Sequence, residues 1–201
     1  NVVLDDLDRI EVVSGPGGTL WGANAVNGVI NVVTKSAKET QGFPASSGGG
    51  SLMKDFDQVR YGFKIGSRVF LRVYGQYFNQ RSADLSEIGS DTIKNAWNIV
   101  QGGFRMDYYP STSNTLTVQG DFYDGEENSE TKFSVTDGQN ILTRFTHIFS
   151  DEANLRVQLY FDRTWRTTPN STQPFFYELY TYDLDIQHRF SFGSKQSILY
   201  G

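Results

Sequence analysis

The sequence of 201 residues has no cysteine, 5 prolines, 2 methionines and no long apolar run. The absence of cysteine excludes a disulfide scaffold and a thiolate metal site, although it does not fix the cellular compartment. No stretch approaches the roughly 18 consecutive apolar residues of a membrane-spanning helix. A transmembrane β-barrel stays open as a possibility, because each of its strands is polar on one face.

Positive charge is also scarce. The 18 Lys and Arg residues stand against 23 Asp and Glu, which gives a formal net charge of −5 and a pI near 5.0. No Lys/Arg-rich run overrides this average. The charge balance therefore argues against a nucleic-acid partner.

The glycine-rich stretch IEVVSGPGGTLWGANAVNGVINVVTK, residues 10–35, has the strand-and-turn layout of a phosphate-binding loop. A dinucleotide fingerprint requires Gly-x-Gly-x-x-Gly, and Gly15 and Gly17 fit it, but the third position is Leu20. A P-loop requires a lysine after its glycines, and the stretch contains none before Lys35. The spacing therefore argues against a nucleotide site.

From Gly50 onward the sequence shows no apolar run at helical spacing, and apolar and polar residues alternate instead. In residues 155–161, for example, Leu159 shares an apolar face with its second neighbours, whereas Gln158 belongs to the polar face. The alternation predicts about nine antiparallel strands. It is clearest in residues 59–65, 69–77, 115–123, 155–161 and 180–190, and weaker in 96–108 and 141–149.

Short and long connections alternate between these expected strands. The expected short turns are residues 66–68, 109–114, 150–154 and 191–195, and the expected long loops are 81–93, 125–137 and 166–176. This asymmetry is typical of an outer-membrane barrel, with short periplasmic turns and longer external loops. A soluble antiparallel β-domain acting as a binding module also alternates apolar and polar residues, and it stays open as the alternative. Dependence on detergent would separate the two.

The segment DDLDRIEVVSGPGGTLWGANAVNGVINVVTK, residues 5–35, closely resembles the end of the plug domain of TonB-dependent outer-membrane receptors. In that family the motif leads into barrel strands through a Gly-rich stretch, as SSGGGSLMKDFDQVRYGFKIG does here. The resemblance implies a structural role for the glycines, because they allow two strands and a tight connection to pack closely. The plug-motif residues are Arg9, Glu11, Gly15, Pro16, Trp21, Gly22, Gly28, Asn31, Thr34 and Lys35.

The resemblance implies a mainly β fold in two parts. Residues 1–45 are expected to form the C-terminal part of a plug domain. Residues 46–201 are expected to form the first antiparallel, up-and-down strands of a transmembrane β-barrel of about 22 strands. We expect truncation at both ends, because Asn1 follows no methionine or signal peptide and the last residues, SILYG, have the pattern of the middle of a strand.

The resemblance also implies a function. The protein is expected to be a non-enzymatic receptor in the outer membrane of a Gram-negative bacterium, taking up a scarce ligand such as a siderophore, vitamin or sugar. The implied partners are the TonB complex, bound through an N-terminal part that this sequence lacks, a small-molecule ligand and outer-membrane lipid. No cofactor and no nucleic acid are implied.

Other polar residues give no catalytic constellation. The two histidines, His147 and His188, fall on apolar strand faces, which favours packed or interfacial side chains over metal ligands. Asp183 and Asp185 share the polar face of one strand, and we expect them to face the barrel lumen, with Arg9 and the Thr34–Lys35 pair as partners.

The stretch DGEENSE lies on an expected long loop and supplies carboxylates that are candidate ligand or Ca²⁺ contacts. These residues are Asp124, Glu126, Glu127 and Glu130. The stretch lacks the Asp-x-Asp-x-Asp-Gly spacing of a calcium loop, so an ordinary solvated acidic loop is the alternative.

Overall fold

The computed structural model describes residues 4–15, 27–82, 95–129, 133–168, 175–192 and 196–201. These residues form a short 3-10 helix and eleven strands: η1 (Leu4–Asp6), β1 (Leu7–Ser14), β2 (Gly28–Thr34), β3 (Ala45–Gly48), β4 (Met53–Ile65), β5 (Val69–Gln80), β6 (Asn95–Tyr108), β7 (Asn114–Ser129), β8 (Phe133–Ser150), β9 (Ala153–Thr168), β10 (Phe175–Phe192) and β11 (Gln196–Tyr200). Within these ranges, no helix has the length and apolar character needed to cross a membrane.

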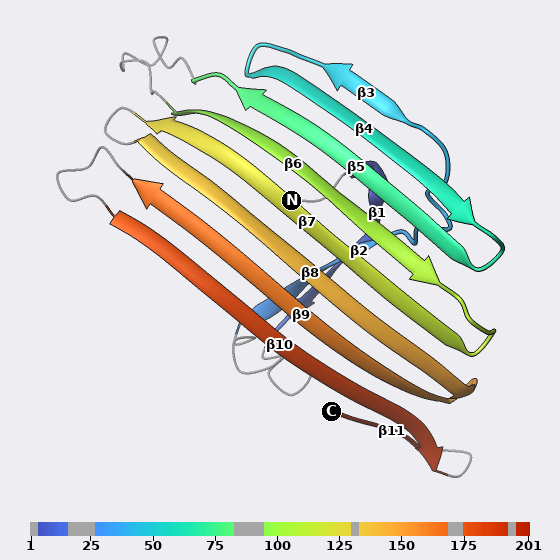
Figure 1. Ribbon diagram of the computed structural model, residues 1–201. Coiled ribbons are helices and arrows are strands. Elements are labelled where there is room, and N and C mark those ends of the chain that lie inside the picture. The colour runs from blue at the N-terminus through green and yellow to red at the C-terminus, as the bar shows by residue number, and fades with distance from the viewer. Residues whose placement is uncertain (1–3, 16–26, 83–94, 130–132, 169–174, 193–195) are drawn as a thin grey trace.

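Strands β3 to β11 form one antiparallel sheet in which every strand pairs with its neighbour in sequence. The sheet is open, with β3 and β11 at its edges, and Figure 1 shows it as a twisted meander. The prediction of a mainly β, antiparallel, up-and-down fold is confirmed. Strands β8 and β10 have 18 residues each, more than the about 9–11 that cross a bilayer at a tilt.

One predicted long loop, residues 125–137, is largely strand, and both ends of another, residues 166–176, also belong to strands. Residues 125–129 of β7 pair with β8, with Gly125 opposite Thr136 and Asn128 opposite Phe133. Strand β9 likewise continues to Thr168, and β10 begins at Phe175. The loop prediction was wrong here because polar residues that end an apolar pattern can still satisfy their backbone groups in a β-ladder.

The two faces of the large sheet differ in chemistry, as the alternation predicts. One row of cross-strand partners is apolar in all seven strands that it crosses: Tyr61, Val73, Phe104, Gly120, Ile141, Phe161 and Tyr182. The next row toward the short turns, on the same face, includes Leu159 and Leu184, which are 55% and 60% exposed. The other face carries Arg60, Arg72 and Arg105. We call these the apolar face and the polar face.

Strands β1 and β2 form a separate two-stranded antiparallel sheet, with Leu7 opposite Thr34 and Ser14 opposite Gly28. Figure 1 shows this hairpin on one side of the large sheet, and side-chain contacts from Thr34 to Arg105 place it against the polar face. The chain then crosses the polar face, forms an antiparallel bridge between Gly42 and Gly62, and enters the edge strand β3.

Candidate functional site

The buried residues of this protein are mostly polar. Among the described residues, Ala37 is the one buried hydrophobic residue, and several of the buried polar side chains lie where the N-terminal segment meets the large sheet. We call this contact the docking interface. It consists of Asp6, Thr34, Lys35, Ala37 and Thr40 from the segment and Arg60, Arg72, Arg105, Asp107 and Thr117 from the sheet.

Asp6 ends η1 and points its carboxylate into the polar face of the sheet. Its Oδ1 atom pairs with Arg60 on β4, and its Oδ2 atom lies 3.2 Å from Nε of Arg72 on β5. Only 1% of Asp6 is exposed. Because a charge removed from water is strongly destabilising without a partner, the two guanidinium groups make this position tolerable for a carboxylate.

Arg72 joins three parts of the N-terminal segment. In addition to its pair with Asp6, its Nη1 atom donates to the backbone carbonyl of Lys35 at 3.1 Å and to the hydroxyl of Thr40 at 3.3 Å. Arg72 stands directly opposite Arg105 on β6. Like charges at such a position repel, so the carboxylates of Asp6 and Asp107 are needed to balance the pair.

Asp107 on β6 is the second buried carboxylate, with 1% of its surface exposed. Its Oδ2 atom accepts hydrogen bonds from the backbone N–H of Ala37 at 2.6 Å and from Nε of Arg105 at 3.0 Å. Its Oδ1 atom accepts one from the hydroxyl of Thr117 at 2.7 Å. Arg105 in turn donates to the hydroxyl of Thr34 at 3.1 Å, so Asp107 holds the N-terminal segment directly at Ala37 and through Arg105 at Thr34.

A local turn presents Ala37 to Asp107. In the sequence Ser36-Ala37-Lys38-Glu39, Glu39 accepts hydrogen bonds from the hydroxyl of Ser36 at 2.6 Å and from its backbone N–H at 2.9 Å. In return, the backbone N–H of Glu39 donates to the hydroxyl of Ser36 at 3.3 Å, which completes a capping box. The two hydrogen bonds that the Glu39 carboxylate accepts lower its pKa below the ordinary value.

Close backbone approach explains one glycine of β4. A Cβ atom at Gly62 would overlap the carbonyl oxygen of Thr40 and lie 2.8 Å from Cα of Gln41. Any larger residue would therefore displace the crossing segment from the sheet.

The described plug-motif residues of the hairpin form a smaller polar cluster. Arg9 contacts Glu11 and Asp8, each at 2.6 Å, and Asn31 donates to Glu11 at 2.8 Å across the two strands. The hydrogen bond from Asn31, followed by that from Arg9, lowers the pKa of Glu11. This cluster ties β1 to β2.

The other motif residues divide into three groups. Gly15 has φ +98°, and a Cβ atom at Gly28 would lie 2.7 Å from the carbonyl oxygen of Val13, so both positions favour glycine. Thr34 and Lys35 belong to the docking interface, where they contact Arg105 and Arg72. Pro16, Trp21 and Gly22 lie outside the described residues, as does Glu130 of the acidic stretch.

The structure corrects two expectations about carboxylates. Asp124, Glu126 and Glu127 lie on strand β7, not on a loop, and Glu127 pairs with Arg166 of β9 at 3.4 Å. Asp185 pairs with Arg156 at 3.5 Å. The expected partners are engaged elsewhere, since Arg9 contacts Asp8 and Glu11, and Lys35 contacts the backbone carbonyl of Asp5.

Both histidines lie in aromatic surroundings near the short turns. The ring of Phe149 lies 4.4 Å from that of His147 and 5.9 Å from that of His188. His188 also contacts the hydroxyl of Tyr200 at 3.0 Å. Within the described parts of the chain, no group of three or more His, Asp or Glu residues is arranged to hold a metal ion.

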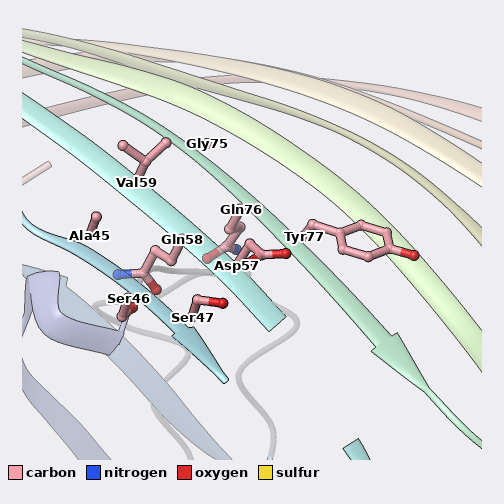
Figure 2. Close-up of a pocket in the computed structure, with 9 residues that line it drawn as sticks. All are labelled: Ala45, Ser46, Ser47, Asp57, Gln58, Val59, Gly75, Gln76 and Tyr77. Atoms are coloured by element: carbon pink, nitrogen blue, oxygen red, sulfur yellow. The ribbon is translucent and has the colours of Figure 1, made fainter. Parts of the chain in front are cut away.

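A surface hollow of about 440 Å³ lies between β3, β4 and β5, and Figure 2 shows the side chains that surround it. It is lined by Ala45, Ser46, Ser47, Asp57, Gln58, Val59, Gly75, Gln76 and Tyr77. The lining contains one carboxylate and no plug-motif residue. It brings together no acid–base pair, so it carries no catalytic assignment.

Sequence reasoning missed the partners that matter most at the docking interface: Asp6, Arg60, Arg72, Arg105 and Asp107. A partial signal was present, because all three arginines occupy polar-face positions of neighbouring strands. Arg60 contacts a residue 54 positions away in sequence, and Arg105 contacts one 71 positions away. The burial of these arginines depends on such contacts. Strand periodicity cannot supply such a long-range partner.

Comparison with known proteins links this geometry to a family. A 45-residue segment is 49% identical to the vitamin B12 transporter BtuB of Vibrio vulnificus strain CMCP6, covering 22% of this chain and 7% of the relative. A 72-residue segment is 39% identical to the vitamin B12 transporter BtuB of a Vibrio cholerae serotype O1 strain, covering 36% and 12%. No family model matches the chain.

Solved structures share the fold over nearly the whole chain. The open form of the ferric-catecholate import receptor Fiu from E. coli K12 superposes with a TM-score of 0.72 at 14% identity, covering 94% of this chain and 37% of that one. The siderophore receptor PiuA from Acinetobacter baumannii gives 0.72 at 13% identity, covering 94% and 33%. The copper transporter OprC gives 0.69 at 16% identity, covering 92% and 31%.

In sequence motif and in fold, the chain is similar to TonB-dependent outer-membrane receptors. The predicted localisation in the outer membrane of a Gram-negative bacterium is also confirmed. The relatives are transporters and receptors by name, which fits a receptor that is not an enzyme. The matched segments span 7% and 12% of the curated relatives, and the chain spans 31–37% of the solved structures.

Proposed function

We propose that this receptor imports a scarce small molecule across the outer membrane with energy from the TonB complex. Residues 1–45 are the C-terminal part of its plug domain, and residues 46–201 are the N-terminal portion of its barrel wall. The ligand is of the siderophore, vitamin or sugar type. Relatives named for vitamin B12, ferric catecholate, siderophore and copper transport support this class.

The proposal rests on one observation. The N-terminal segment contacts the polar face of the large sheet, and the opposite face of that sheet is apolar. The apolar face exposes large side chains on seven neighbouring strands, including Val73, Phe122, Leu159 and Leu184. Soluble monomers rarely expose an apolar patch that continues across so many strands, whereas a membrane-spanning barrel requires one. The docked segment lies on the opposite face, which would be the lumen of such a barrel.

The polar character of the docking interface suits a plug that has to move. An apolar interface would be held by a non-directional hydrophobic effect over its whole area. A few directional contacts, such as those of Asp6, Asp107 and Arg105, can be broken and reformed at defined points. We further propose that Asp124, Glu126 and Glu127 of β7 lie near the ligand entrance.

Uptake in cells tests the proposal. A strain lacking the gene is complemented with the receptor, and accumulation of labelled ferric siderophores, vitamin B12 and sugars is measured with and without an active TonB complex. We expect one ligand class to accumulate only when both are present. Accumulation that is unaffected by loss of TonB would contradict the proposed energy source.

Membrane extraction tests the alternative of a soluble binding module. The receptor is expected in the outer-membrane fraction and to stay monodisperse only in detergent. A monodisperse protein in detergent-free buffer would favour the soluble β-domain.

A further inference from the structure

Within the described residues, side-chain contacts to the large sheet lie at the open end of the N-terminal hairpin, where the chain enters β1 and leaves β2. This open end pairs Leu7 with Thr34, and the backbone N–H of Lys35 donates to the carbonyl of Asp6 at 2.8 Å. Beyond it, β1 and β2 lead away from these contacts toward Ser14 and Gly28. Anything that separates the two strands from this end has to act on Asp6 first.

Asp6 is also the buried residue of the open end, with 1% of its surface exposed. Its carboxylate lies between Arg60 and Arg72, with side-chain exposures of 12% and 6%. Arg72 binds both sides of the open end, since it contacts the carboxylate of Asp6 and the backbone carbonyl of Lys35. One guanidinium group on β5 therefore clamps the start of β1 to the end of β2.

We propose that Asp6 is a positioning residue that stops a pull on the N-terminal side of the chain from reaching the hairpin. The inference rests on the proposed function, in which the energising complex acts on the plug from that side. Residues ahead of Asp6 can be displaced, while β1, β2 and the crossing segment stay on the barrel wall.

The geometry of the hairpin explains why such a stop is needed. Leu7 and Thr34 are adjacent, so a pull at Leu7 against a fixed Thr34 would separate the strands one backbone pair at a time. A ladder opened in this way resists force weakly, because each step breaks only one small set of hydrogen bonds. The buried ion pairs of Asp6 carry the load before it reaches the ladder, and losing one partner of such a group is strongly destabilising.

Single-molecule pulling tests the inference. The complete receptor in lipid vesicles is pulled through a handle placed ahead of Leu4, and the chain length released in each step is measured. In the wild type, residues 7–34 should stay bound after the first step. In Asp6→Asn, those residues should be released in the first step, which lengthens it by about 100 Å.

Asp8→Asn is the matched control. Asp8 also pairs with an arginine, but both partners are exposed and both belong to β1. Its first step should equal that of the wild type. Equal first steps in wild type and Asp6→Asn, or release of residues 7–34 in the wild-type first step, would overturn the inference.

A second variant covers the case in which Asp6→Asn prevents docking. Arg60→Gln leaves Arg72 paired with Asp6 and should lower the force at which residues 7–34 are released without abolishing the separate step. An unchanged release force in this variant would also count against the inference. Because pulling needs neither ligand nor TonB, its outcome is independent of the uptake test.

Discussion

The carboxylate of Asp107 accepts a hydrogen bond of 2.6 Å from the backbone N–H of Ala37, which lies 70 residues earlier in the chain. A side chain of the barrel wall thus fixes a backbone atom of the N-terminal segment. The same carboxylate satisfies Arg105 and Thr117. The docking interface therefore contains two buried carboxylates that each join several partners: Asp107 and Asp6.

Replacing Asp107 should loosen the crossing segment. Asp107→Ala removes the acceptor of Nε of Arg105 and of the N–H of Ala37, and each buried unsatisfied group costs about 1–3 kcal/mol. We expect faster proteolysis of residues 35–44 in the folded receptor. Asp151→Ala, in the exposed turn between β8 and β9, is the control. Equal proteolysis of the two variants would contradict the role of Asp107.

The assignment of faces predicts opposite responses on a single strand. Leu184→Arg on β10 places a charge on the apolar face and should cost roughly 2–4 kcal/mol at mid-bilayer depth. Thr181→Arg places the same charge on the polar face, opposite Asp162, and should cost much less. Folding yields in lipid vesicles measure the difference. Similar yields would show that the faces are wrongly assigned.

The sequence was sufficient to predict the faces of the sheet. Alternation placed Leu159 and Gln158 on opposite faces, and Gln158 does accept hydrogen bonds from Arg144 on the polar face. It failed at residues 125–129, where β7 continues with polar side chains on both faces. Hydrophobic periodicity arises only where one face of a strand lies in apolar surroundings. It gives no signal where two paired strands extend beyond those surroundings.

The candidate site was only partly predictable. The motif directed attention to Arg9 and Glu11, which form local contacts within the hairpin. Asp6 precedes them in a run of acidic residues that has the composition of a solvated surface. Its burial arises from Arg60, 54 positions away, and no local pattern encodes that contact.

Acid should weaken the turn that presents Ala37. Because hydrogen bonds from Ser36 lower the pKa of Glu39 in the folded state, the carboxylate contributes stability that is fully present above its ordinary value of 4.5. That contribution is lost as the pH falls through the lower folded value. We expect proteolysis of residues 35–44 to accelerate below about pH 4.5 in the wild type.

Two variants isolate this effect from general acid sensitivity. Glu39→Gln cannot titrate, and Ser36→Ala removes the hydroxyl that donates at 2.6 Å. Both should show a smaller acceleration between neutral and acid pH than the wild type. An acceleration of wild-type size in Glu39→Gln would assign the acid response to other groups.

Gly62 provides the sharpest test of docking, because its effect is steric and not electrostatic. Gly62→Ala places a methyl group where the carbonyl oxygen of Thr40 lies, so the crossing segment has to move away from β4. The backbone bridge between Gly42 and Gly62 should then be lost. We expect the segment to become accessible to protease while the barrel strands stay folded.

Gly75→Ala on β5 is the matched control, since a Cβ atom there meets no atom closer than 4.0 Å. A strand-interior glycine is less favourable than alanine by about 0.5–1 kcal/mol, so this variant should be neutral or slightly stabilised. Proteolysis and uptake are measured for both variants. Because Gly62→Ala removes no charge, reduced uptake in this variant alone would show that transport requires the crossing segment to be seated on the wall. Full uptake with an undocked segment would show that it does not.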